Sequence, residues 1–190
     1  MLGTVVISLN GAEVSAQIPA KSLALLCYLA ATGHTHSREK LAGLLWGDKS
    51  EDSAKANLRK LLSNLGQMFG NALIISRQTV AFNRDNAYRL DVEVFETAVA
   101  EDDPAPEKLE PLREAVELYR GDFLEGFSVQ QTLGFEEWVL GERERERLRQ
   151  MAIQALQRLS EAYTAQYIRP SFVILGKLLL PLRLLTVKPI

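Results

Sequence analysis

The sequence predicts an α+β N-terminal half followed by an all-helical C-terminal half, and three observations support this division. Short stretches with the composition of β-strands occur only before Asp91. Between these stretches lie three segments in which apolar residues recur at helical spacing. Beyond Asp91, only helical patterns and polar connections follow. We therefore expect two domains in the 190 residues of the chain.

The composition is that of an ordinary soluble globular protein, with 47% hydrophobic and 24% charged residues. The net charge of −2 argues against a protein that coats nucleic acid nonspecifically, because such proteins carry a large basic excess. Residues 1–96 carry ten Lys and Arg against nine Asp and Glu, whereas the remaining residues carry 12 against 15. Any contact with nucleic acid must therefore be local, and the first half is expected to make it.

The single cysteine and the two chain ends indicate a cytoplasmic protein without a membrane partner. Cys27 lies in an apolar helical run, so we expect it to fill core space in a reducing compartment. The N-terminus has no basic region and becomes polar by Ser8, which favours a strand over a signal peptide. Prolines and charges interrupt the leucine-rich segment 168–190, which therefore lacks the roughly 20 apolar residues of a membrane span.

The chain is expected to begin with a β-hairpin and a buried helix. Residues 4–9 and 12–18 are predicted strands around Asn10-Gly11, a turn dipeptide whose residues tolerate positive φ. Pro19 and Gly33 then mark the start and the end of a helix over residues 20–32.

Two further helices and a second hairpin follow. Ser37 is the expected N-cap of a short helix that ends at Gly47, and residues 51–69 form a longer helix that ends at Gly70. Residues 73–76 and 79–82 alternate around a turn, and residues 87–90 are predicted to form another short strand. Two strands, three helices and a β-hairpin, in this order, are typical of a winged helix-turn-helix domain.

The C-terminal half is predicted to be helical over residues 92–100, 106–119 and 135–163. The long third segment keeps the spacing of a buried stripe along most of its length. Within it, residues 142–149 alternate Glu and Arg, a pattern typical of a solvated helix face.

The predicted helix over residues 51–69 carries the candidate site. At about 100° per residue, its leucines and Phe69 fall on one side. The polar side chains that point away from them are Arg59, Lys60, Ser63 and Gln67. Arg and Lys can reach phosphates or guanine, and Asn or Gln can address adenine. A helix built this way can dock by its leucines and offer its polar face to a groove of DNA.

A family resemblance covers roughly residues 5–165, and five motifs carry it. They are LCYLA at 26–30, SREKLAGLLW at 37–46, ANLRKLLSNL at 56–65, YRLDVEVFE at 88–96 and YRGDFLEG at 119–126. Together they resemble the SARP-type regulators, in which an OmpR-like winged helix precedes a bacterial transcriptional activator domain of tetratricopeptide-like helices. The resemblance implies a DNA-binding domain over residues 1–96, an activator domain over residues 97–167 and an irregular apolar tail over residues 168–190.

The resemblance also implies a function, namely sequence-specific regulation of transcription, and not catalysis. The third helix would enter the major groove of double-stranded DNA, and the wing would reach the backbone or the minor groove. The residues that fall on the matching helix and wing are Lys55, Arg59, Lys60, Ser63, Asn64, Gln67, Arg77 and Arg84. The implied partners are DNA at repeated sites, RNA polymerase and a second copy of the chain, and no cofactor is implied.

Two departures from the family pattern lead to further expectations. The end of the third helix has no basic residue where relatives often have arginines, and Gly66 weakens the helix by up to about 1 kcal/mol relative to alanine. Reduced affinity for DNA is therefore expected. Relatives also continue with more repeat helices, whereas here the proline-broken segment follows. The helical domain is thus expected to be truncated and to expose apolar surface, because such units bury their faces only against neighbours.

Two other functions compete with DNA binding. The first is an enzyme. Against it, His34 and His36 are expected to be turn residues that belong to no cluster of metal ligands. The carboxylates within residues 121–126 are expected to shape a turn. No Gly-rich phosphate loop with Lys and Ser or Thr is present in the sequence. The stronger alternative is a protein-protein interaction module whose winged helix has lost DNA affinity, which the nearly neutral first half favours.

Overall fold

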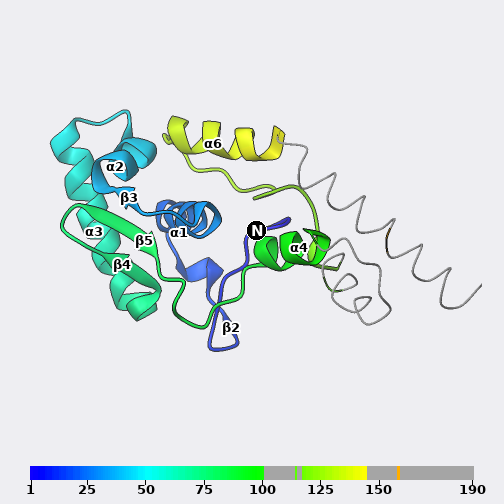
Figure 1. Cartoon of the computed structure of the whole chain (residues 1–190). Coiled ribbons are helices and arrows are strands. Elements are labelled where there is room, and N and C mark those ends of the chain that lie inside the picture. The colour runs from blue at the N-terminus through cyan, green and yellow to red at the C-terminus, as the bar shows by residue number, and fades with distance from the viewer. Residues whose placement is uncertain (101–113, 115–116, 145–157, 159–190) are drawn as a thin grey trace, which may run out of the picture.

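The computed structural model describes residues 1–100, 114, 117–144 and 158. The elements from the N-terminus through the third α-helix are, in order, β1 (Ser8–Leu9), β2 (Ala12–Glu13), η1 (Ser15–Gln17), α1 (Ala20–Thr32), β3 (His36–Ser37), α2 (Arg38–Trp46) and α3 (Glu51–Phe69). The remaining described elements are η2 (Gly70–Ala72), β4 (Leu73–Ile75), β5 (Thr79–Phe82), α4 (Asp91–Ala100) and α6 (Leu133–Glu144) (Figure 1). This mixture of small sheets and helices is compatible with a winged-helix-like domain followed by a helical region.

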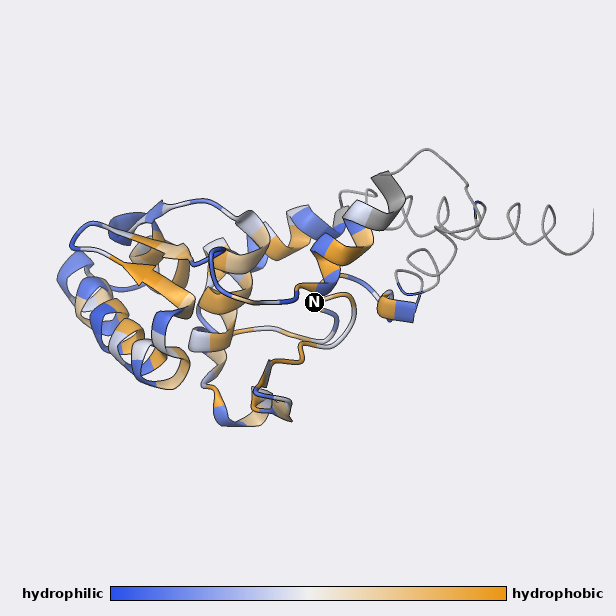
Figure 2. Cartoon of the chain, turned by 60° about the horizontal axis from the view of Figure 1, so that its bottom comes forward, coloured by the Kyte–Doolittle hydropathy of each residue, from blue (hydrophilic) through white to orange (hydrophobic). Residues whose placement is uncertain are grey.

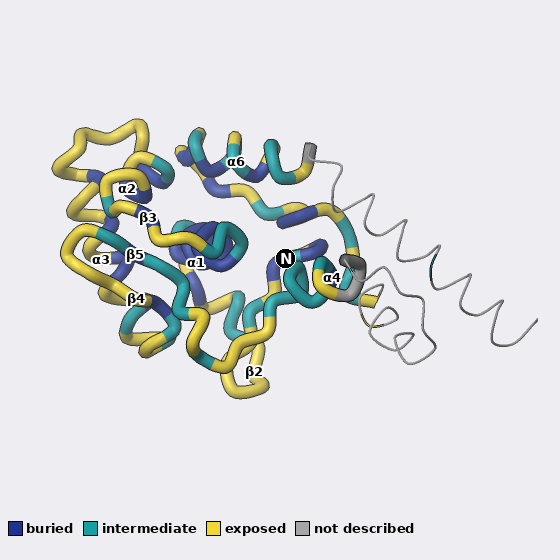
Figure 3. Tube along the Cα trace, viewed as in Figure 1, coloured by how far each residue is buried: buried dark blue, intermediate teal, exposed yellow. Residues whose placement is uncertain are grey.

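Helices α1, α2 and α3 form the centre of the fold, and their predicted bounds are confirmed. Helix α1 is buried continuously over residues 22–30, including Cys27, and lies in the middle of the molecule (Figure 3). It ends at Gly33, which takes the left-handed conformation at φ 64° and donates its N–H to the Leu29 carbonyl at 3.1 Å. Burial raises the pKa of the Cys27 thiol to about 12, which suits a residue that fills core space.

The second sheet has the order β3-β5-β4, and all its pairs are antiparallel. The β4–β5 hairpin was predicted, but β3 was not, and the predicted strand over residues 87–90 is absent. That part of the prediction is wrong because β5 is already paired on both edges, so residues 87–90 have no free neighbour there. Instead, the Tyr88 ring packs edge-on against Phe82 at a centroid distance of 5.1 Å.

The first hairpin turns at Asn10-Gly11 as predicted, but its strands are shorter than expected. Asn10 and Gly11 both have positive φ, at 52° and 83°. The chain leaves the ladder at Ser15, whose hydroxyl oxygen accepts the Ile7 N–H at 2.7 Å while residues 15–17 turn into η1. At the start of the chain, Leu2 forms a bridge with Phe123 from the C-terminal half.

Ser37 caps α2, and Ser37→Ala is expected to lower the free energy of unfolding by about 1 kcal/mol. The Ser37 hydroxyl oxygen accepts a hydrogen bond from the Lys40 backbone N–H at 3.1 Å. Ser50, at the N-cap of α3, accepts no backbone N–H of its helix, and its hydroxyl donates to the exposed Ser53 hydroxyl at 2.9 Å. Ser50→Ala is therefore the matched control, with a smaller expected loss in urea denaturation. Equal losses in the two variants would contradict the role of the cap.

Helix α6 packs on the N-terminal half, and the two halves share one hydrophobic core. The C-terminal contribution consists of Phe123, Leu124, Val129, Phe135 and Val139, all buried. Arg143 holds the loop before α6 in place by donating to the carbonyls of Phe123 and Leu124, the first at 2.7 Å. Arg143 is exposed, as predicted for a solvated helix face, and makes these two hydrogen bonds in addition. Residues 145–149 of the alternating Glu-Arg run lie outside the described residues.

The predicted helices of the C-terminal half are described only in part. The first begins one residue earlier than predicted, at Asp91, and the long one begins at Leu133. Most of the predicted helix 106–119, the continuation of the long helix and the segment 168–190 lie outside the described residues. Among the described helices, none is both long and apolar enough to cross a membrane.

Candidate nucleic-acid interface

Helix α3 presents one polar face to solvent because its leucines bind it to the core. Leu58, Leu61, Leu62 and Leu65 are all buried, and the main contacts of α3 are with α1, α2, η2 and β4. All the candidate DNA-contacting residues predicted on this helix lie on its exposed surface: Lys55, Arg59, Lys60, Ser63, Asn64 and Gln67. Figure 3 shows the outer side of α3 as exposed, and Figure 2 shows hydrophilic residues alternating with hydrophobic ones along it.

Four of these residues share the middle of the exposed face. At about 100° per residue, Ser63 and Gln67 lie opposite the buried leucines, with Arg59 on one side and Lys60 on the other. Gly66 does not interrupt the helix, which continues to Phe69. The face therefore combines two cations with two hydrogen-bonding side chains on one continuous helix.

A second polar stripe on α3 was not identified in the sequence. Four exposed residues follow one another along it at spacings of four, three and four positions: Ser53, Asn57, Lys60 and Asn64. The signal was available, because these positions repeat the helical period on the edge of the same face. Asn57 and Asn64 are the members of this stripe whose amides could address adenine.

Acidic residues at the start of α3 reduce its positive charge. Glu51 and Asp52 occupy the first turn, where negative charge is favoured by the helix dipole. The Lys55 ammonium group forms an ion pair with Glu51 one turn away. A hydrogen bond from Lys55 lowers the pKa of the Glu51 carboxyl, and the same bond raises the pKa of Lys55. Lys55 is therefore already partnered within its own helix, whereas among the described residues no ion pair is formed by Arg59 or Lys60.

The turn between β4 and β5 carries Arg77 at an exposed position. Ser76 fixes this turn, since its hydroxyl oxygen accepts the N–H groups of Gln78 at 3.2 Å and Thr79 at 2.8 Å. The Gln78 carbonyl also accepts the Arg38 N–H at 2.8 Å, which ties the hairpin tip to the start of α2. The β4–β5 hairpin, here called the wing, is thus held in a defined position beside the helices.

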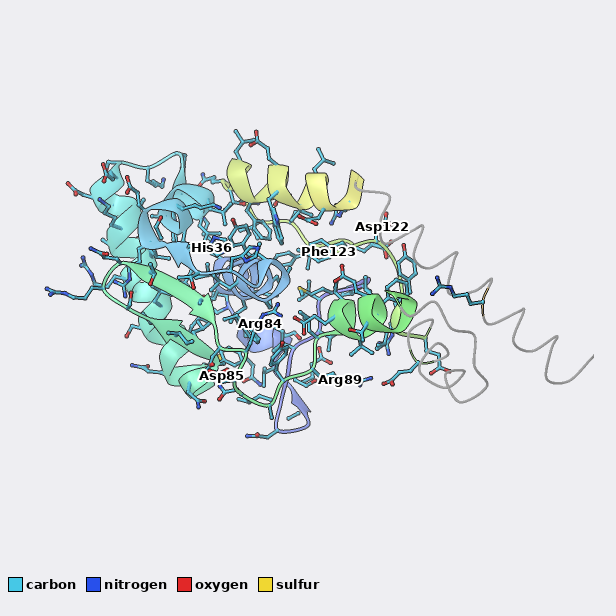
Figure 4. All side chains as sticks on the ribbon, viewed as in Figure 1. His36, Arg84, Asp85, Arg89, Asp122 and Phe123 are labelled. Carbon is cyan, nitrogen blue, oxygen red and sulfur yellow. The ribbon has the colours of Figure 1, made fainter. Side chains whose placement is uncertain are left out.

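Arg84 does not join the other predicted residues. Its guanidinium group forms an ion pair with Glu93 on α4 at 2.6 Å and donates to the Ala30 carbonyl on α1 at 3.4 Å. A Cβ atom at Gly33 would lie 2.5 Å from Arg84 Nη2, so the glycine leaves room for this side chain. Arg84 therefore links α1 to α4, and Figure 4 shows it away from α3.

His36 is a buried strand residue, so its prediction as a turn residue is wrong. It lies in β3, paired with Val80, because the chain re-enters the sheet before α2 begins. Its Nε2 is 2.8 Å from the Thr32 hydroxyl, and its ring packs against Tyr28 at a centroid distance of 4.8 Å. His34 is exposed between α1 and β3. Within the described residues, no group of three or more His, Cys, Asp or Glu side chains is placed to hold a metal.

Protonation of His36 is expected to destabilise the fold. Burial lowers the pKa of His36 below its ordinary value of 6.5, and the nearby Lys40 and His34 act in the same direction. The unfolded chain therefore binds this proton more readily, so the stabilisation is present above pH 6.5 and is lost as the pH falls toward the folded-state pKa. Urea denaturation at neutral and mildly acidic pH measures the loss.

The matched variants for this pH dependence are His36→Gln and His34→Gln. His36→Gln should remove most of the dependence in this range, whatever it does to stability at neutral pH. His34→Gln should retain most of it, because His34 is exposed. An unchanged pH dependence in His36→Gln would show that another group is responsible.

Residues 90–167 match the family described as the bacterial transcriptional activator domain. The described part of this match comprises α4, the loop that contains Phe123 and α6. The matched family is one of transcription regulator domains and not a family of enzymes. The comparison with curated proteins gave no significant match.

Proposed function

We propose that this chain, which carries the bacterial transcriptional activator domain that is the hallmark of SARP-type activators, binds specific sequences of duplex DNA through α3. The observation that carries the proposal is the continuous exposed face of α3, with Arg59, Lys60, Ser63 and Gln67 opposite its buried leucines. These side-chain types can contact both phosphates and base edges. The proposal places the protein in the cytoplasm with its DNA.

The dimensions of α3 suit the major groove. Its 19 residues span roughly 28 Å, and the major groove, about 12 Å wide, accepts one α-helix. The exposed tip of the wing carries Arg77 on a turn that hydrogen bonds hold in place. In the proposed complex, α3 reads base edges and Arg77 contacts the adjacent backbone or minor groove. Arg84 has no part in it, because it is bound to Glu93 and Ala30.

The helical region is proposed to arrange protomers or to contact RNA polymerase. Among the described helices of this region, α6 has its main contacts with α2, and α4 lies across α1 from α3 (Figure 1). The polar face of α3 therefore stays open while the helical region binds a partner. Because α6 shares the core of the N-terminal half, a protein bound to it would be held in a fixed relation to the DNA.

Selection of bound sequences from random duplex DNA by the purified chain tests the proposal. We expect enrichment of a repeated motif, and a binding constant for that motif that falls with salt. Each neutralised phosphate should contribute about −0.9 to the slope of log affinity against log salt. A well-folded chain that enriches no sequence would contradict the proposal.

The second candidate function is a protein-protein interaction module that does not bind DNA. The observation that favours it is the outer strand of the wing, where Ile74 is 52% and Ile75 38% exposed on β4, an edge strand. The strands of this sheet carry the hydrophobic colour in Figure 2. For this function, the selection would enrich no motif, and Ile74→Lys would abolish capture of a partner without changing the fold.

A further inference from the structure

Helix α3 contains two exposed asparagines, Asn57 and Asn64, at interior positions. Asparagine is less favourable than alanine inside a helix, because its side chain competes for the backbone hydrogen bonds. Within the described residues, neither of these carboxamides is hydrogen-bonded to the protein. Residues that break a local rule without a compensating contact are expected at functional sites. The two asparagines are therefore suited to contacts outside the chain.

The asparagines that follow α3 have partners within the protein. Asn71 in η2 donates its side-chain N–H to the Asn86 carboxamide oxygen at 3.0 Å. Asn83 and Asn86 both donate to the Asn71 backbone carbonyl at 2.8 Å. These three side chains hold η2 against the segment after β5. The asparagines near the end of α3 thus stabilise the fold, whereas those on its polar face do not.

Lys60 lies between the two asparagines of α3 on one stripe of the helix. Asn57 precedes it by three residues and Asn64 follows it by four, so all three side chains share one side of the helix. The first turn of α3 carries Glu51 and Asp52, whose negative charges repel phosphates. In the proposed complex, the middle of the helix around Lys60 is therefore the part that approaches the duplex most closely. Both asparagines then lie next to the base edges.

A carboxamide matches adenine better than any other base in the major groove. Its oxygen accepts from the N6 amino group of adenine while its N–H donates to N7, so two hydrogen bonds form together. Guanine presents two acceptors there, N7 and O6, which leaves the carboxamide oxygen facing O6 without a donor. Cytosine and thymine each offer the carboxamide a single hydrogen bond. Adenine is therefore the base that a carboxamide on this stripe selects.

We infer that Asn57 and Asn64 are specificity-determining residues, each of which reads one adenine in the major groove. The inference rests on the proposed binding of DNA by α3. Seven residues separate the two asparagines by about 10 Å along the helix, which corresponds to about two to three base pairs of a duplex that rises about 3.4 Å per pair. The bound sequence therefore contains two A·T pairs at this separation. Ala56, exposed beside Asn57, adds a methyl group that can contact the thymine methyl of such a pair.

Selection from random duplex DNA by the unmodified chain, Asn57→Ala and Asn64→Ala tests the assignment. At each of the two positions, we expect the unmodified chain to prefer A·T by roughly 5- to 150-fold, the value of one bidentate contact. Each variant should lose the preference at one position and keep it at the other. Gln130→Ala is the matched control and should keep both, because Gln130 is an exposed carboxamide in the turn before α6.

Replacing one adenine of the motif by 7-deazaadenine identifies the atom that is read. This base lacks the N7 acceptor and still pairs with thymine. At the position assigned to Asn57, it should weaken binding by the unmodified chain and leave the affinity of Asn57→Ala unchanged. The salt slope should be the same in Asn57→Ala as in the unmodified chain, because asparagine neutralises no phosphate. The midpoint of urea denaturation should not fall, since alanine is the better helix former.

The outcomes separate this inference from the proposed function. A motif without two such A·T pairs, or one whose preferences are identical in all variants, would overturn the inference and leave DNA binding by α3 intact. Sensitivity to 7-deazaadenine that persists in Asn57→Ala would assign the adenine to another residue and overturn it as well. A well-folded chain that enriches no motif would contradict the proposed function and this inference with it.

Discussion

Phe135→Ala is expected to lower the free energy of unfolding by roughly 3–5 kcal/mol, which is the typical cost of removing a fully buried phenyl ring. Phe135 on α6 has no exposed surface and contacts the rings of Phe127 and Trp138 at centroid distances of 6.1 Å and 5.5 Å. Because whole domains are stable by only about 5–15 kcal/mol, the loss is a large part of the total. Urea denaturation followed by circular dichroism measures it.

The same variant tests whether the two halves share one core. Phe135 belongs to the cluster that also contains the buried residues of α1, α2 and α3. The amide protons of α1 should therefore exchange faster in Phe135→Ala, although α1 and α6 are more than 100 residues apart in sequence. Leu133→Ala is the matched control, because Leu133 lies on the same helix and is 75% exposed. Unchanged exchange in α1 would show two independent cores.

The helices of the N-terminal half could be predicted because their signals are local. Pro19 and Gly33 at the ends of α1, and the Ser37 cap of α2, act on residues within one turn of themselves. The buried face of α3 follows from the spacing of four leucines within eight positions. Since the leucine face determines the opposite face, the candidate DNA-contacting residues of α3 followed directly from the sequence.

The features that could not be predicted depend on partners distant in sequence. β3 has only two residues, and it forms because β5, more than 40 residues later, offers a free edge. Arg84 looked like a wing residue, but Glu93 and the Ala30 carbonyl lie within its reach only after α1 and α4 have packed. A cavity of about 730 Å³ between α1, α4 and α6 is likewise lined by residues from 28 to 142, and no local pattern brings them together.

Replacing both Arg59 and Lys60 by Ala is expected to weaken specific DNA binding by about 2–6 kcal/mol, because each base or phosphate contact is worth roughly 1–3 kcal/mol. Both side chains are exposed on α3, and alanine is compatible with the helix. If both cations contact phosphates, the slope of log affinity against log salt should also decrease in magnitude by about 1.8. Fluorescence anisotropy with the selected DNA motif, over a series of salt concentrations, measures both quantities.

The matched control removes the same charge from another part of the surface. Arg89 and Arg120 are both exposed, and Figure 4 shows Arg89 beside α4, away from α3. Replacing both by Ala changes the net charge by the same amount, so it reproduces any effect of overall electrostatics but removes no contact of α3. Equal losses in the two double variants would mean that charge alone governs affinity, and Arg59 and Lys60 would then not belong to the recognition face. A loss of DNA affinity seen only in the double variant of Arg59 and Lys60 would place α3 against the DNA.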